Sequence, residues 1–266
     1  MEFVIAFFIG ILSSITASML GIGGGVVIVP LSLIFLKLPI HNAIAVSLVT
    51  IVSTSLLVTY KNIEKKIINM PMGLGLEVST SIFAVVASLI AINLNQDVLK
   101  IAFGVFLLSL SFFMMKNSKS KYEYSETNGK FSYFDQNLNK VVYYDIKNIP
   151  MAILISSFAG FLSGMLGVGG GIVKVPILNA VCKIPIKAAT ATSSMMVGIT
   201  AACASIVYFR HGYVIPNIVL FMSLGAVFGS KVGLYIAHKA KNEVIEKVFI
   251  ALLLIVAIEM IVKALI

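Results

Sequence analysis

Charged residues are scarce in this chain of 266 residues: 12% are Asp, Glu, Lys or Arg, whereas 59% are hydrophobic. Soluble domains carry roughly 25% charged and about 45–50% apolar residues, so the composition excludes an ordinary soluble protein. Long uncharged runs, such as 3–20 and 43–60, approach or reach the ~20 residues that cross a hydrocarbon core. These runs are continuously apolar, whereas barrel strands alternate. The sequence therefore predicts an all-α integral membrane protein.

Cysteine, histidine and acidic residues are also few. Cys182 and Cys203 cannot form a disulfide framework, and no His/Cys/Asp/Glu cluster has metal-ligand spacing. An enzyme embedded in the membrane would need such a cluster or a nucleophile–base pair, so we expect no catalysis, no metal and no cofactor. The shortage of acids leaves a net charge of +9. Because the lysines lie mainly in short connections, we expect them to face lipid head groups and not nucleic acid.

A glycine-rich phrase occurs twice. "MLGIGGGVVIVP" begins at Met19, and "MLGVGGGIVKVP" begins at Met165, which is 146 positions later. Over 19–47, 15 of 29 positions are identical to those 146 residues further on. Because a duplicated membrane unit produces such spacing, we predict two tandem homologous repeats.

Each repeat is predicted to contain four spanning helices and one Gly-rich short helix. The short apolar pieces, 26–36 and 172–181, are too short to cross a membrane straight, so we interpret them as breaks that enter it and turn back. Four spans is an even number and makes the repeats parallel, whereas a short piece that crossed would give five spans and an inverted repeat. The predicted domains are 1–115 and 149–266, joined by a polar linker at 116–148.

The linker contains two stretches, 131–134 and 140–144, that can pair as a small hairpin across "DQNLN". We otherwise expect the linker to be a solvated tether without chemistry. With four spans per repeat, Lys and Arg are more numerous on the side that holds both termini and the linker. The positive-inside rule then predicts that the termini and the linker are cytoplasmic.

Three consecutive glycines interrupt the apolar sequence of each repeat. They are Gly23, Gly24 and Gly25 in the first repeat and Gly169, Gly170 and Gly171 in the second. A broken backbone at membrane depth is tolerated only where protein or a water-filled cavity satisfies it. A helix that restarts there presents unpaired N–H groups and the positive end of its dipole, which suits an anion. Close helix packing is the other explanation for small residues, but the duplication favours a substrate-binding site.

Lys174 stands where the first copy has Ile28. A lysine at membrane depth is costly and is usually functional, unless its side chain reaches the interface. Beside the start of a helix, it would add a full positive charge to the anion site. Glu77 lies several residues inside its predicted helix and either carries a coupling proton or pairs with a lysine.

Small hydroxyl residues follow each short piece and complete the predicted binding site. They are Ser47 in the first repeat and Thr190, Thr192 and Ser193 in the second. Hydroxyl groups can donate hydrogen bonds to an oxyanion without burying a charge. Their alternative role is hydrogen bonding between helices or capping.

The segments "GIGGGVVIVPL", "GVGGGIVKVPIL" and "ATATSSMMVGITAACASIVYFRHG" resemble the TauE/SafE sulfite-exporter family of membrane permeases. The resemblance covers both repeats and implies a transporter of small sulfur-containing or organic anions, such as sulfite, sulfonates or sulfoacetate. The family's glycine motifs correspond to 23–25 and 169–171, and its Ala-x-Gly/Ala-Thr-Ser segment corresponds to 189–193. The first copy departs from this pattern, because Val46 stands where the family usually has Thr.

The expected function is secondary transport of a small anion across the cell membrane, with the anion bound at helix N-termini between the repeats. A passive anion channel is the alternative, and a membrane-embedded enzyme is a more distant one. The expected partners are the small anion and the lipid bilayer, and the pattern specifies no oligomeric state.

Overall fold

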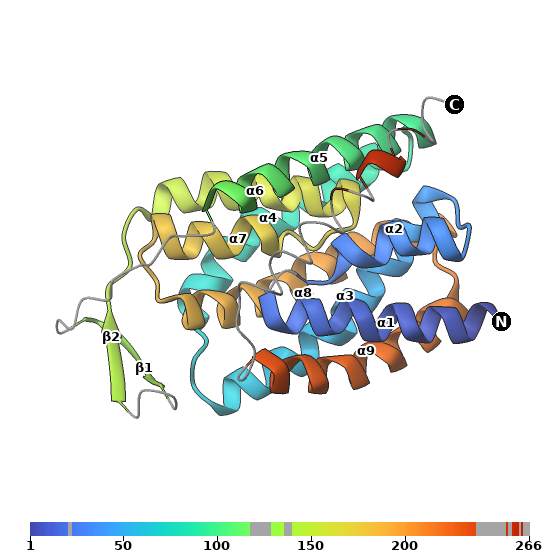
Figure 1. Cartoon of the computed structure of the whole chain (residues 1–266). Helices are drawn as coiled ribbons and strands as arrows, with labels where there is room; N and C mark the ends of the chain where they lie inside the picture. Colours follow the sequence, from blue (N-terminus) through green and yellow to red (C-terminus); the bar gives the residue numbers. More distant parts are fainter. Residues whose placement is uncertain are drawn as a thin grey trace.

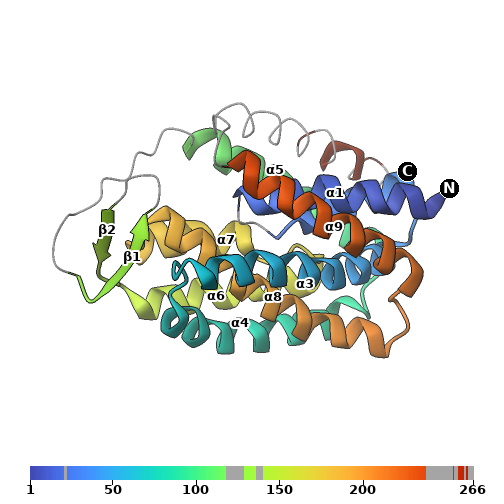
Figure 2. The same cartoon turned by 90° about the horizontal axis from the view of Figure 1, so that it is seen from below.

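The computed structural model describes residues 1–20, 23–117, 129–135 and 140–237, together with 254, 257–260 and 262. Its helices form an elongated bundle, and a two-stranded hairpin lies at one end (Figures 1 and 2). Within the described residues, five helices are long and apolar enough to cross a membrane. The prediction of a helical integral membrane protein is therefore confirmed.

The first half of the chain contributes five helices. They are α1 (Glu2–Leu20), α2 (Gly25–Phe35), α3 (Ile40–Glu64), α4 (Met70–Ala91) and α5 (Gln96–Asn117). Asn69 caps α4, because its side chain accepts a hydrogen bond from the backbone N–H of Met72 at 3.1 Å. Pro71 follows in the first turn, where its missing N–H costs no helical hydrogen bond.

The second half repeats this order with the same spacing. It contains α6 (Ile149–Leu166), α7 (Gly171–Pro176), the π-helical turn η1 (Ile177–Val181), α8 (Ile186–Arg210) and α9 (Pro216–Ala237). Adding 146 to the bounds of α3 gives those of α8, and the same shift converts α4 into α9. Together, α7 and η1 occupy the place that corresponds to α2.

The first helix of each half packs along the fourth helix of the other half. A Cβ atom placed on Gly225 or Gly233 of α9 would meet the carbonyl oxygen of Phe7 or Ile15 of α1. Residue numbers therefore rise together along the two helices, which run parallel. Glycine allows this close approach of backbones, as is common between helices in membranes.

The corresponding pair, α4 and α6, has the same geometry. Gly160 and Gly164 of α6 lie against the carbonyl oxygens of Thr80 and Ala84 of α4. These two helices also run parallel to each other. The two pairs are related by the 146-residue shift, which converts α1 into α6 and α4 into α9.

The central helices α3 and α8 run in opposite directions. Asn42, near the start of α3, donates a hydrogen bond to the carbonyl oxygen of Tyr213, just beyond α8, at 2.9 Å. Further along α3, Ser55 donates to the carbonyl oxygen of Ser194, near the start of α8, at 2.5 Å. In Figure 1, α1 begins at the end of the bundle opposite the hairpin, whereas α6 begins beside the hairpin.

The predicted parallel arrangement of the two halves is therefore wrong. Although α2 is short, it continues from a bend inside the bundle and returns the chain to the end at which α1 began. The helices α3, α4 and α5 then run along the bundle in alternating directions, so the described chain of the first half ends at the opposite end of the bundle from its start. The described helices of the two halves are thus inverted relative to each other, although the short helix turns back and does not cross as the five-span alternative required.

The hairpin consists of β1 (Phe131–Asp135) and β2 (Lys140–Tyr144), which pair antiparallel with Phe131 opposite Tyr144. The predicted pairing of these stretches is confirmed. Tyr133, Val142 and Tyr144 are buried in a cluster that includes Met72 of α4. This part of the linker is packed on the bundle, so the expected solvated tether is wrong here.

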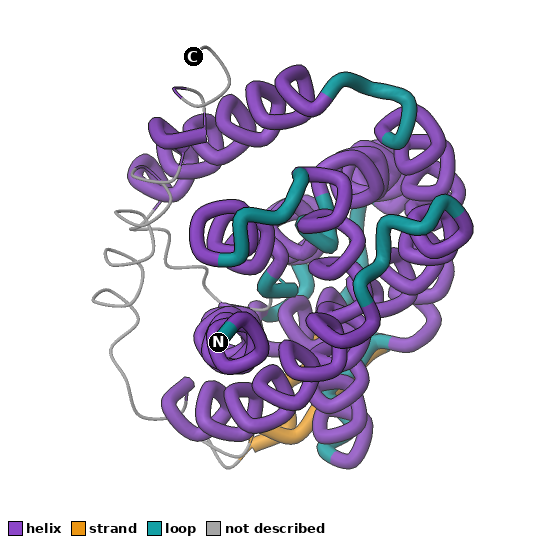
Figure 3. The backbone as a smooth tube through the Cα atoms, turned by 90° about the vertical axis from the view of Figure 1, so that its right-hand side faces the viewer, coloured by secondary structure: helices purple, strands orange, loops and turns teal. Residues whose placement is uncertain are grey.

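The hairpin and the N terminus lie at opposite ends of the bundle. Seen from the end where the N terminus lies, the strands lie behind the helices (Figure 3). The sequence predicts that the N terminus and the linker face the same side of the membrane, whereas the N terminus and the described hairpin lie at opposite ends of the bundle.

Candidate functional site

Both glycine-rich segments form tight bends that only glycine adopts easily. The φ angles are +86° and +77° at Gly23 and Gly24, and +80° and +71° at Gly169 and Gly170. These values lie in the left-handed region, where a Cβ atom is penalised. The short helices α2 and α7 each begin at the next residue. We call 23–25 the first glycine corner and 167–171 the second glycine corner.

The two glycine corners contact each other inside the bundle. A Cβ atom on Gly25 would collide with the carbonyl oxygen of Gly167. One on Gly23 would lie 2.7 Å from Cγ1 of Val197, and one on Gly169 would lie 2.8 Å from the same atom. The helix starts of the two halves are thus neighbours, as the sequence predicts, but they are packed against protein.

The free space at this contact is small. A cavity of about 10 Å³ lies beside the first glycine corner. Its lining residues are Ala17, Gly23, Thr54, Ser55, Val58, Ser194 and Val197. This volume corresponds to about one water molecule, so an oxyanion requires the corners to move apart.

The predicted hydroxyl residues divide between this centre and the hairpin end of α8. Ser47 is fully buried and donates a hydrogen bond to the carbonyl oxygen of Gly167, at the second glycine corner, at 2.7 Å. Its counterpart Ser193 is also fully buried, and its Oγ has no hydrogen-bond partner in the described structure. Thr192 accepts from the backbone N–H of Asn69 at 3.0 Å, which ties α8 to the start of α4.

Thr190 differs from the other three. It is partly exposed, and its hydroxyl donates to the carbonyl oxygen of Ile186 in its own helix. This is the ordinary back-bonding of a helical threonine. In this structure Thr190 therefore lies apart from the glycine corners.

Lys174 lies in the first turn of α7, where its backbone N–H bonds to the carbonyl oxygen of Gly170. Its side chain is 0% exposed, which excludes the interpretation that it reaches the membrane interface. Nζ donates to Oε2 of Glu77 at 3.0 Å and to Oγ1 of Thr200 at 2.6 Å. The short helix of the second half therefore brings a fully buried ammonium group into contact with α4 and α8.

Glu77 is the ionic partner of Lys174, and its side chain is 3% exposed. Its other oxygen, Oε1, accepts hydrogen bonds from Thr200 and, at 3.2 Å, from Ser81. Of the two roles considered from the sequence, pairing with a lysine is the one present in the structure. Buried ions need such compensation, because desolvation of an unpaired charge is very unfavourable.

Thr200 was not predicted as part of the site. It contacts both charged groups, and its Oγ1 also lies 3.0 Å from the carbonyl oxygen of Met196, so its single hydroxyl proton has two nearby acceptors, that carbonyl and the Glu77 carboxylate. A signal was present in the sequence, because Thr54, which lies 146 residues earlier, is also threonine. We call Lys174, Glu77, Thr200 and Ser81 the ion-pair cluster.

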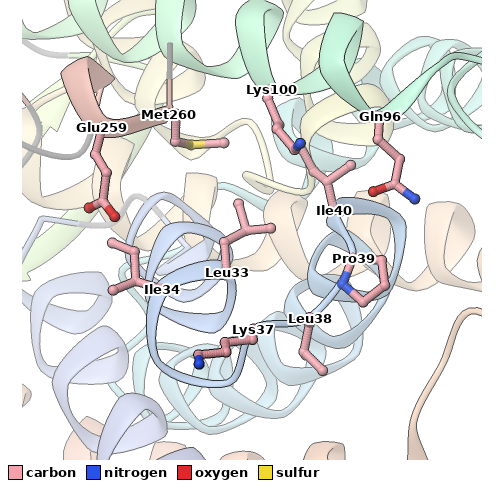
Figure 4. Close-up of a pocket in the computed structure, with 10 residues that line it drawn as sticks. All are labelled: Leu33, Ile34, Lys37, Leu38, Pro39, Ile40, Gln96, Lys100, Glu259 and Met260. Atoms are coloured by element: carbon pink, nitrogen blue, oxygen red, sulfur yellow. The ribbon is translucent and has the colours of Figure 1, made fainter. Parts of the chain in front are cut away.

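A larger pocket lies at the end of the bundle opposite the hairpin and has a volume of about 430 Å³ (Figure 4). Its lining residues are Leu33, Ile34, Lys37, Leu38, Pro39, Ile40, Gln96, Lys100, Glu259 and Met260. They come from separate parts of the chain, so sequence spacing could not predict the pocket. Lys100 is also paired with Asp97, at 2.8 Å.

The described residues contain no group of three or more His, Cys, Asp or Glu that could hold a metal ion. His41 instead contacts the carbonyl oxygen of Ala91, at 3.1 Å, where α3 begins near the end of α4. The buried polar groups of the described interior include hydroxyl groups, the amides of two helix starts and the Lys174–Glu77 ion pair.

Apolar helices that form a bundle, with bent short helices and a buried ion pair inside it, are typical of membrane transporters. The family model of the sulfite exporter TauE/SafE matches residues 6–260. The chain therefore belongs to the TauE/SafE family, as the resemblance in its glycine motifs predicts.

Two relatives match most of the chain. A probable membrane transporter protein, YunE of Bacillus subtilis (strain 168), is 27% identical over 269 residues, which cover 98% of each chain. The probable membrane transporter protein MJ0441 of Methanocaldococcus jannaschii is 28% identical over 246 residues, covering 87% of this chain and 85% of the relative. No solved structure matches the chain.

Proposed function

We propose that this protein is a secondary transporter of a small anion, and that the anion contains sulfur, as sulfite, sulfonates and sulfoacetate do. The observation that carries this proposal is Lys174, a fully buried cation one turn after a glycine corner of a TauE/SafE protein. A buried ammonium provides the charge that an anion needs, and the nearby helix start adds backbone N–H donors.

The proposed binding site lies between the two halves. It consists of Gly23, Gly24, Gly25, Gly169, Gly170, Gly171, Lys174, Ser47, Thr190, Thr192 and Ser193. The contact between the glycine corners supports a state in which the site is closed. Binding then requires the corners to separate, and the partly exposed Thr190 would have to approach the anion during this motion.

The proposed transport motion is a rocking of one inverted repeat against the other. The 146-residue spacing and the opposite directions of α3 and α8 support an internal duplication whose copies are inverted. Transporters built this way expose a central site to each side in turn by rocking one repeat against the other. The mutual contact of the glycine corners lies at the place where such rocking would open a path.

The hairpin end of the bundle is the proposed cytoplasmic side. Basic residues in the described connections and helix ends there are Lys61, Lys65, Lys66, Lys130, Lys140, Lys147, Lys183 and Lys187. Those at the opposite end are Lys37, Lys100 and Arg210. The positive-inside rule therefore favours a cytoplasmic hairpin and an N terminus outside. This replaces the expectation of a cytoplasmic N terminus.

Cysteine labelling tests this orientation in a Cys182→Ala/Cys203→Ala background. Ser132 in the hairpin and Asn93 after α4 are both exposed and lie at opposite ends. On intact cells, a membrane-impermeant maleimide should label Asn93→Cys and should label Ser132→Cys only after permeabilisation. The reverse pattern contradicts the proposed orientation.

Flux measurements test the proposed function. Purified protein in liposomes should carry at least one of sulfite, thiosulfate, methanesulfonate and sulfoacetate, and the carried anion should raise the thermal stability in detergent. Lys174→Met should abolish this flux, whereas Lys183→Met, which changes an exposed lysine beyond the same short helix, should not.

The double variant Lys174→Met/Glu77→Gln controls for folding, because it removes both buried charges together. It should elute like the wild type from a size-exclusion column and carry no anion. Unchanged flux in a folded Lys174 variant removes Lys174 from the site, and absence of flux of every anion tested contradicts the proposed function.

A further inference from the structure

The Lys174–Glu77 pair is electrically neutral before any anion arrives. Both side chains are buried, and their charged atoms are 3.0 Å apart. The amine that is proposed to bind the anion therefore already has a negative partner. An incoming anion must replace that carboxylate at the ammonium group or share the ammonium with it.

Few other charges can compensate Glu77. The helix α6, which packs along α4, contains no ionisable acid or base. From α8, Thr200 contacts the carboxylate, while Lys187 and Arg210 lie in the first and last turns of that helix. The hairpin contributes the hydroxyl of Tyr144, which instead accepts a hydrogen bond from Asn69 at 3.0 Å. Within the described residues, Lys174 is the cation that faces Glu77.

An anion bound to Lys174 would leave the Glu77 carboxylate buried without its counter-ion. Removing one partner of a buried ion pair is strongly unfavourable, because the remaining charge has lost both water and its partner. A proton from solvent cancels this charge by converting the carboxylate into a neutral carboxyl group. The hydroxyls of Thr200 and Ser81, already bonded to Oε1, can accept from or donate to that group.

We propose that Glu77 takes up one proton each time an anion replaces it at Lys174, so that the protein carries one proton with each anion. This inference rests on the proposed function, and it specifies the coupling ion. The cluster then alternates between two neutral states, one with Lys174 and Glu77 paired and one with Lys174 paired to a monovalent anion beside protonated Glu77.

The duplicated site formed by the equivalent positions, Ile28 and Ser223, cannot bind a second proton, which is why we propose one proton for each anion. The positions that correspond to Lys174 and Glu77 are Ile28 and Ser223, 146 residues away in each case. Ser223 accepts a hydrogen bond from Ser53 at 3.2 Å, and Ile28 is almost fully buried. The equivalent site therefore offers neither the cation nor the titratable carboxyl group.

Methanesulfonate and thiosulfate are suitable probes, because neither takes up a proton near neutral pH. An inward gradient of methanesulfonate should acidify liposomes that contain the wild-type protein and a trapped pH dye, with one proton for each anion carried. Thiosulfate is divalent, so it should also bring one proton but should move one net negative charge with it. Methanesulfonate flux should be insensitive to a potassium-diffusion potential, since an anion and a proton together carry no net charge.

Glu77→Gln should still carry methanesulfonate but should move no protons, and its flux should now respond to the potential. Glu64→Gln, which removes an exposed carboxylate at the end of α3, should retain the wild-type ratio of one proton. If Glu77→Gln does not fold, the proton count of the wild type alone decides the proposal.

Anion flux without proton movement in the wild type, or proton movement that persists in Glu77→Gln, overturns the inference and leaves the proposed function standing. No flux of either probe or of the other anions tested overturns the proposed function and the inference with it. A flux that is driven by the potential alone in the wild type shows that transport is uncoupled from protons and likewise overturns the inference.

Discussion

The short helices of the two halves occupy equivalent places but differ in charge and in form. In the first half, α2 is α-helical throughout and carries Ile28 in its first turn. In the second half, α7 carries Lys174 at the same place and continues as the π-helical turn η1. Both halves have a short helix after a glycine corner, but only the short helix of the second half carries a charged residue.

The difference extends to the surrounding helices. Lys174 meets Glu77 on a helix of the other half, while the position that corresponds to Glu77 holds Ser223. Near the end of η1, the backbone N–H of Cys182 bonds to the carbonyl oxygen of Ile177, five residues earlier. Single π-type turns often accompany functional sites, so the altered form and the added charge occur together. The comparison teaches that the two halves share the arrangement of their helices, and that the buried charges belong to the asymmetry between them.

Introducing the lysine of the second half into the first half should cause the largest loss of stability. Ile28→Lys places an ammonium where Ser223 cannot neutralise it, so we expect a loss of several kcal/mol, sufficient to prevent purification of folded protein. Adding Ser223→Glu should restore part of the lost stability by supplying the missing partner. Thermal unfolding in detergent measures both. An Ile28→Lys protein as stable as the wild type would show that the two short helices do not have equivalent surroundings.

Removing the charge from the second half should have the next largest effect. Lys174→Met leaves Glu77 buried alone and should cost about 3–5 kcal/mol. Lys174→Met/Glu77→Gln should recover most of this, because neither charge remains. Lys183→Met should change the free energy of unfolding by no more than about 0.5 kcal/mol. Equal stabilities of the single and double variants would contradict a strong ion pair.

The two equivalent threonines should differ in importance. Thr200 contacts both charged groups, whereas Thr54 bonds to the carbonyl oxygen of Thr50 in its own helix. We expect Thr200→Val to cost about 1.5–3 kcal/mol, since hydrogen bonds to charged groups are the stronger ones, and Thr54→Val about 1 kcal/mol or less. Unfolding curves of the two variants, recorded side by side, should show the order. A larger loss for Thr54→Val would mean that the asymmetry of the cluster is unimportant for stability.

The smallest effect is expected at the start of α4. Tyr144 of the hairpin accepts a hydrogen bond from Asn69, and burial raises the pKa of its phenol, so the hydroxyl stays protonated. Tyr144→Phe should cost about 0.5–1.5 kcal/mol. Position 215, the counterpart of Asn69, is Ile and cannot make such a bond. Thermal unfolding with and without Asn69→Ala distinguishes the hydrogen bond from the ring packing.

The sequence predicted the helical bundle, the short helices, the hairpin and the family from local signals. Apolar runs, prolines after each short piece and the 146-residue repeat are all visible without a structure. The direction of the second half was mispredicted, because it depends on how deep in the bundle the glycine corners lie. An 11-residue helix such as α2 can return the chain to its starting end from a deep corner, and spacing alone does not report depth.

Two members of the ion-pair cluster were candidates from the sequence, but their contacts were not predictable. Lys174 and Glu77 were both candidates, but they are 97 residues apart in the chain, and only tertiary packing brings them together. Ser47 does reach a glycine corner, whereas Thr190 bonds within its own helix. Which hydroxyl points inward depends on the rotation of α3 and α8 about their axes. Apolar and small residues occur on several faces of these two helices, so the sequence pattern does not show which face is turned inward.

The exchange of helices between the halves has a consequence for synthesis. Because α1 packs along α9, and α6 along α4, neither half can finish its own packing alone. During translation, α1 is made early, whereas its partner α9 is made late. The face of α1 that packs against α9 therefore stays without its partner until most of the polypeptide has been synthesised. Truncated chains should therefore be substrates for membrane quality control, and two separately made halves should assemble only when they are produced in the same cell.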